Sequence, residues 1–143
     1  MRKPKITTEE IRRAYKETGV QPTKCEWYDY QTKAACALGV KYIHMKKIVI
    51  DEDNPDYTLE FDVLPWAENK YGEKYVEGFV DGFDGKKTPP YYHKSELSKR
   101  EKEQMLHGFA DGHRINHYLF KLDSKRNKKL FANLSSVGGN CSG

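Results

Sequence analysis

The stretches GFVDGF at residues 78–83 and GFADGH at residues 108–113 repeat the pattern Gly-Phe-x-Asp-Gly thirty positions apart. In each copy two glycines stand four residues apart, so on a helix they would lie on one side. A glycine inside a helix costs about 1 kcal/mol relative to alanine, and close approach of another backbone is the simplest compensation. We therefore predict two helices that pack on one another along a glycine edge, formed by Gly78, Gly82, Gly108 and Gly112.

The residues around each copy also have a helical pattern. The predicted apolar face of the first copy consists of Tyr75, Val76, Phe79, Val80 and Phe83. The equivalent positions of the second copy are Met105, Leu106, Phe109, Ala110 and His113. The pattern predicts that both faces are packed in a core. A ligand site over the glycines is the alternative interpretation of the repeat.

Each copy carries one aspartate beside its glycines, Asp81 in the first and Asp111 in the second. Two carboxylates brought close together could bind a cation, or act as acid and base in catalysis. A solvated helix face, or a bond to a neighbouring helix terminus, explains such residues more simply. We expect this second role, and we assign no catalytic residue.

His113 and His117 stand four residues apart, the spacing at which two imidazoles on one helix can hold a metal ion. Arg114 replaces the glutamate of the H-E-x-x-H pattern, and the sequence identifies no third ligand. We expect a packed histidine at position 113, an ordinary one at 117, and no metal or other cofactor. A metal-dependent enzyme that uses this pair is one alternative function.

Two helix starts are marked by capping residues. Thr7 stands three residues before Glu10, and Ser98 three residues before Glu101, which is the spacing of a capping box. The helices predicted from these signals cover residues 8–18 and 98–120.

Periodicity predicts further helices at about residues 31–45 and 73–84, and two short strands in the 24–30 and 47–50 regions. Pro65 argues against one continuous helix across its position, although it could begin a short one. The predicted fold class is mainly α, or α+β with a minor strand pair. Four to five helices form a single compact domain over residues 1–123, and residues 124–143 are a mobile tail that is first basic and then rich in Ser and Gly.

The net charge of +4 is concentrated at the two ends of the 143-residue chain. Residues 1–5 carry +3 and residues 121–129 carry +4, which leaves residues 6–120 at −3. Basic ends can contact phosphates without reading bases, so a nucleic-acid-binding protein is an alternative function. The candidate phosphate contacts are Lys121, Lys125, Arg126, Lys128 and Lys129.

The sequence also bears on location. Its longest apolar run, residues 34–40, is far shorter than the roughly 18 residues that indicate a membrane span. The basic N-terminus is not followed by the apolar region of a secretory signal. Three cysteines at spacings that match no zinc or redox motif favour free thiols in a reducing cytoplasm. We therefore predict a cytoplasmic protein with no membrane partner.

Four short motifs resemble those of small uncharacterised bacterial proteins. They are the Tyr-x-x-Thr-Gly pattern at residues 15–19, WYD at 27–29, ACALG at 35–39 and GFxxGFDG at 78–85. The resemblance covers about half of the chain, and the motifs consist of small and aromatic residues that packed cores use. It implies a compact cytoplasmic domain and transfers no functional site.

Ten tyrosines and six phenylalanines supply much of the apolar content. Tyrosine is common at protein interfaces, because its ring is apolar and its hydroxyl is polar. The function predicted from the sequence is therefore a non-enzymatic protein-binding or regulatory module. Its partner would be another protein or a second copy of the chain.

Overall fold

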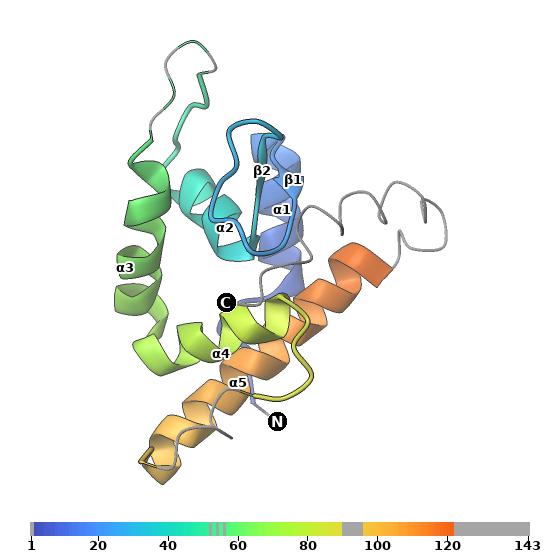
Figure 1. Cartoon of the computed structure of the whole chain (residues 1–143). Helices are drawn as coiled ribbons and strands as arrows, with labels where there is room; N and C mark the ends of the chain where they lie inside the picture. The colour runs from blue at the N-terminus through green and yellow to red at the C-terminus, as the bar shows by residue number, and fades with distance from the viewer. Residues whose placement is uncertain (1, 52, 54, 56, 90–95, 122–143) are drawn as a thin grey trace.

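Figure 1 shows the computed structural model, which describes residues 2–51, 53, 55, 57–89 and 96–121, the last without its side chain. The elements are α1 (Thr8–Thr18), β1 (Gln21–Pro22), β2 (Ala34–Ala35), α2 (Ala37–Met45), α3 (Leu59–Tyr71), α4 (Glu73–Phe83), α5 (Lys99–Asn116) and the π-helix η2 (His117–Lys121). The fold is mainly α with a minor pair of strands, as the sequence predicts. The predicted tail, residues 124–143, lies outside the described residues.

The helices with capping signals begin where the sequence predicts them. The Thr7 side chain accepts a hydrogen bond from the Glu10 amide at 3.2 Å, and α1 ends at Gly19 in the left-handed conformation with φ of 75°. At the start of α5, Ser98 and Glu101 form a complete capping box. The regular α-helix ends at Asn116, earlier than predicted, and the chain continues to Lys121 as a π-helix.

The predicted strands at 24–30 and 47–50 are wrong. The two described strands are parallel, and they pair Gln21 with Ala34 and Pro22 with Ala35. Left-handed backbone at Cys25, with φ of 71°, and at Lys47, with φ of 53°, interrupts an extended conformation in the two predicted segments. The strand at 34–35 also delays the helix predicted from residue 31.

Helix α3 is continuous across Pro65, contrary to the prediction. Proline has no N–H to donate to the carbonyl four residues earlier, which here belongs to Phe61. Both residues are exposed, and the Phe61 side chain is 72% accessible. The missing bond therefore falls on the outer side of the helix, where water can satisfy the carbonyl, while Val63 and Ala67 pack inward.

The core lies between α4 and the elements that precede it. Helix α1 packs on α2, α2 on α3 and α3 on α4, while α4 makes its largest contact with α5 (Figure 1). The largest fully buried side chains include Ile11, Leu38, Ile43, Tyr75 and Phe79. No helix among the described residues is long and apolar enough to cross a membrane.

Candidate functional site

The two copies of the repeat lie on α4 and α5, and the two backbones touch at the glycines. A Cβ atom added to Gly78 would collide with the Met105 carbonyl, whose carbon would be 2.8 Å away. In the reciprocal contact, a Cβ atom added to Gly108 would collide with the Tyr75 carbonyl. Even the smallest side chain is therefore excluded at both positions.

The second glycine of each copy makes the same kind of contact one turn further along. Gly82 faces the carbonyl of Phe109, and Gly112 faces the carbonyl of Phe79. Helix backbones this close allow weak Cα–H···O bonds as well as van der Waals contact. The glycine edge is therefore filled by the neighbouring backbone, and it leaves no space for a ligand between the helices.

The contacts also define the relative direction of the two helices. Moving from Gly78 to Gly82 along α4 moves the contact on α5 from Met105 to Phe109. The helices therefore run in the same sense. Gly78 contacts Met105, three positions before Gly108, and Gly108 contacts Tyr75, three positions before Gly78. The two helices are therefore related by an approximate two-fold axis.

The outer faces of the two helices differ. The predicted packing of the second face is correct for Met105, which is fully buried, but wrong for Leu106, Ala110 and His113. Val76, Phe79 and Phe83 of α4 belong to the buried core. At the equivalent positions of α5, Leu106 is 45% accessible and His113 is exposed. Elements α1 to α3 cover the α4 side of the pair, whereas the buried side chains of α5 are on its glycine side.

Asp111 is fully buried beside the glycine contact, so it does not lie on a solvated face. Arg2 Nη2 donates to its Oδ1 at 2.8 Å, and Arg114 Nη1 donates to the same oxygen at 3.1 Å. The Tyr75 hydroxyl donates to Oδ2. Burial opposes ionisation, but the hydrogen bonds from Arg2 and Tyr75 overcome it and hold the pKa of Asp111 below its usual value.

This ion network attaches the N-terminal segment to the helix pair. Arg114 also donates to the Ile6 carbonyl at 3.1 Å, and the Lys5 ammonium donates to the Tyr71 carbonyl at 3.0 Å. Ile6 itself is buried in the core. Asp111 therefore joins α4, α5 and the first residues of the chain, which is a structural role.

The other predicted site residues are not gathered into one constellation. Asp81 pairs with Lys86 at 3.2 Å, so the two aspartates of the repeat have separate partners. His113 stacks on Phe109 with ring centroids 6.0 Å apart and is exposed rather than packed, and His117 is exposed at the start of η2. The described part of the chain contains no group of three residues arranged to hold a metal.

The candidate phosphate contacts lie outside the described side chains. The side chain of Lys121 lies outside the described structure, as do Lys125, Arg126, Lys128 and Lys129. At the N-terminal end, Arg2 donates to Asp111, and the Lys5 ammonium donates to the Tyr71 carbonyl. Both cations therefore have partners within the domain.

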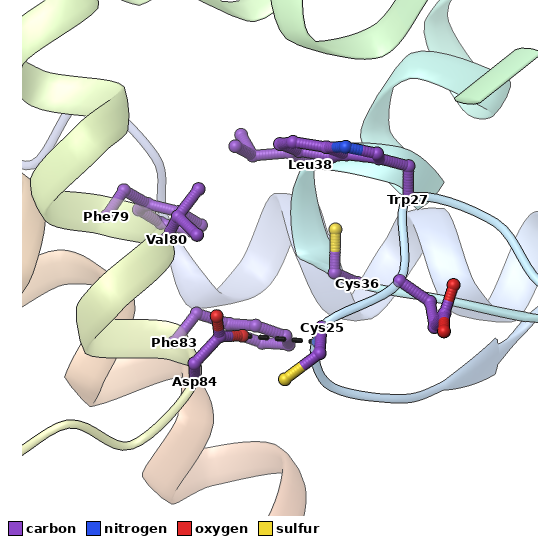
Figure 2. A pocket seen from close by; sticks show the side chains of 9 residues that line it. Cys25, Trp27, Cys36, Leu38, Phe79, Val80, Phe83 and Asp84 are labelled. Atoms are coloured by element: carbon purple, nitrogen blue, oxygen red, sulfur yellow. Dashed lines mark hydrogen bonds between the residues drawn. The ribbon is translucent and has the colours of Figure 1, made fainter. Parts of the chain in front are cut away.

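A cavity of about 130 Å³ lies where α4 faces the segment before α2 (Figure 2). Its apolar walls are Trp27, Leu38, Phe79, Val80 and Phe83. The polar part of the lining comes from Cys25, Glu26, Cys36 and Asp84. In Figure 2 the Trp27 ring lies beside Leu38, and Asp84 lies next to Cys25.

The backbone around the cavity holds these side chains in place. A Cβ atom on Gly39 would collide with the Trp27 carbonyl, so a glycine in α2 allows the Trp27 segment to approach. The Cys25 amide donates to Asp84 Oδ1 at 3.2 Å. Cys25 adopts a left-handed conformation, which is uncommon outside glycine and which Lys33 and Lys47 also adopt.

Both carboxyl groups of the cavity have raised pKa values. Burial is the main cause at Asp84, whose pKa rises to about 6 even though the Cys25 amide stabilises its charge. Burial, followed by repulsion from Asp29 and Glu60, raises the pKa of Glu26. The cavity is therefore an apolar space with acidic groups whose charge is poorly solvated.

The cysteines do not form a nucleophilic site. Cys36 is free and buried, and burial raises the pKa of its thiol to about 12, so it is protonated at neutral pH. Cys25 is disulfide-bonded. The prediction of free thiols is therefore wrong for Cys25.

Sequence reasoning does not find this cavity. Its residues come from three separate segments, and bringing Trp27 near Asp84 requires the segment before α2 to lie against α4. The one usable signal is the Cys-x-Trp pattern after a proline, from which a tryptophan anchored in the core is expected. Trp27 is partly buried against that core.

Comparison of the chain with protein-family models, with curated proteins and with solved structures gives no match.

Proposed function

We propose that the protein is a non-enzymatic binding or regulatory module that contacts another protein, or a second copy of itself, through α3. A row of exposed apolar side chains supports this proposal. Phe61 is 72% and Leu64 39% accessible, and their spacing of three residues puts them on one side of the helix. Tyr57, just before the helix, is 67% accessible. Exposed apolar groups that lie together are typical of interaction sites.

The surroundings of this row indicate the chemistry of the partner. Helix α3 lies at one edge of the molecule, away from α5 (Figure 1). Glu60 and Asp62 are exposed on it, and residues 6–120 as a whole carry −3. A partner with apolar side chains framed by basic ones would be complementary to this surface.

The two alternative functions remain proposals without a supporting contact in the described residues. Nucleic-acid binding depends on the cations from Lys121 onward, since Arg2 and Lys5 are engaged within the domain. Metal-dependent catalysis depends on His113 and His117, for which the described part of the chain supplies no third ligand.

Cytoplasmic localisation also remains a proposal. The disulfide bond at Cys25 argues in the opposite direction, because disulfides are rare in reducing compartments.

The double substitution Phe61→Asp and Leu64→Asp should abolish partner binding and leave the fold intact, because both side chains face solvent. Leu106→Asp is a matched control, since Leu106 has similar exposure but lies on α5. Immobilised wild-type protein and the Leu106→Asp control should both retain one common partner, which is either another protein or a second copy of the chain. Mass spectrometry should show this partner in near-stoichiometric amount. Equal retention by all three proteins would refute the role of α3.

A further inference from the structure

We propose that the surface of α3 binds residues 125–134 of a second copy of the chain, so that two copies exchange their C-terminal segments. The inference rests on the proposed function and names the occupant of the same apolar row. The chemistry of α3, the composition of residues 125–134 and the position of Lys121 carry it.

The surface of α3 combines exposed apolar side chains with a concentrated negative charge. Phe61 is 72% accessible, and Glu60 and Asp62 are exposed on either side of it in the sequence. Neither of these two carboxylates forms an ion pair within the described part of the chain. The stretch from residue 48 to residue 69 contains seven acidic residues and no lysine, arginine or histidine. A segment that is both basic and apolar would therefore be attracted to this surface.

The chain itself contains a segment with the complementary composition. Residues 125–134 read KRNKKLFANL and include no acidic residue. The first half carries four positive charges, and the second half supplies three large apolar side chains. The cations are Lys125, Arg126, Lys128 and Lys129, and the apolar residues are Leu130, Phe131 and Leu134. The cations can therefore pair with Glu60 and Asp62 while the apolar groups cover Phe61.

The position of Lys121 favours a second copy as the source of this segment. Lys121 is the last described residue, and it ends η2 on the side of the molecule opposite α3 (Figure 1). The four residues from Lys121 to Lys125 extend over at most about 14 Å, whereas a domain of this size is roughly 35 Å across. The basic half of the segment therefore reaches α3 of a neighbouring copy more readily than α3 of its own chain.

Exchange between two copies occupies both α3 surfaces at once. Each copy supplies one α3 surface and one C-terminal segment, so a two-fold symmetric pair uses both surfaces and both segments. Glu60 and Asp62 are exposed, and salt screens the attraction between exposed charges. The dimer should therefore weaken as the salt concentration rises, while the apolar contacts keep part of the affinity.

A charge swap in the full chain tests the pairing directly. Lys128→Glu with Lys129→Glu, and separately Glu60→Lys with Asp62→Lys, should each raise the dimer dissociation constant at least about tenfold, because like charges then face one another. Combining all four substitutions should restore the constant to within about threefold of the wild-type value, since opposite charges meet again. Sedimentation equilibrium at low salt measures the dissociation constants.

Lys99→Glu with Lys102→Glu is the matched control, because it changes the net charge equally but alters exposed residues of α5. This variant should dimerise like the wild-type protein. A wild-type chain that stays monomeric at high micromolar concentration would overturn the proposal, as would a four-substitution variant that does not recover or a control that weakens equally. Retention of a different protein through Phe61 and Leu64 would still support the proposed function, so the two failures are distinguishable.

Discussion

Asp111→Asn should lower the free energy of unfolding by about 1–3 kcal/mol, because the hydrogen bonds to a buried carboxylate lose its charge, while the two arginines that it pairs with remain partly exposed to water. The substitution leaves the positive charges of Arg2 and Arg114 without their carboxylate. It also replaces an acceptor of the buried Tyr75 hydroxyl. Chemical denaturation followed by circular dichroism measures the change, and the first residues of the chain should become accessible to proteases.

The matched control is Asp81→Asn, because Asp81 occupies the same position in the other copy of the repeat. It is partly accessible and pairs with one lysine, so its loss should cost less than about 1 kcal/mol. The pH dependence adds a second check. The pKa of Asp111 is lower in the folded protein than in the unfolded chain, where it is about 4. The stability that Asp111 contributes is therefore fully present above about pH 4, and it is lost as the pH falls through the pKa of the folded protein. Equal stability losses in the two variants would contradict the structural role of Asp111.

Gly78→Ala and Gly108→Ala should each destabilise the protein by about 3 kcal/mol, the upper range for inserting a methyl group into packed structure. Alanine normally favours a helix by about 1 kcal/mol over glycine, so the sign of the effect is itself informative. The destabilisation arises because the added Cβ would collide with a backbone carbonyl that cannot rotate away. Thermal melting of the single variants provides the measurement.

Ala110→Gly serves as the control for the glycine variants. Ala110 is exposed on the same helix, so this change should cost only the helix-propensity difference of about 1 kcal/mol. A higher melting temperature for Gly78→Ala or Gly108→Ala than for the wild-type protein would show that the two backbones are not in contact.

The elements that could be predicted are those with local causes. Helix α1 is set by the Thr7 cap and by Gly19, both of which are adjacent to it in the sequence. The start of α5 follows in the same way from Ser98 and Glu101. The repeat predicts a glycine contact because the cost of glycine in a helix requires compensation, whatever the rest of the fold is.

The features that could not be predicted depend on contacts between distant segments. Asp111 is buried because Arg2, 109 positions away, supplies its counter-charge. The two copies of the repeat have similar sequences but different surroundings, since α1 to α3 cover one side of the pair. For the same reason the periodicity that buries Phe83 leaves His113 exposed.

Native mass spectrometry of the purified full chain tests the central claim, that this is a binding module without a catalytic metal. One spectrum reports subunit number, bound metal and any co-purified partner. We predict a complex with a protein or a second copy, without metal, that disappears in the Phe61→Asp, Leu64→Asp variant. A stoichiometric metal adduct that is lost when His113 and His117 are both replaced by alanine would contradict the account.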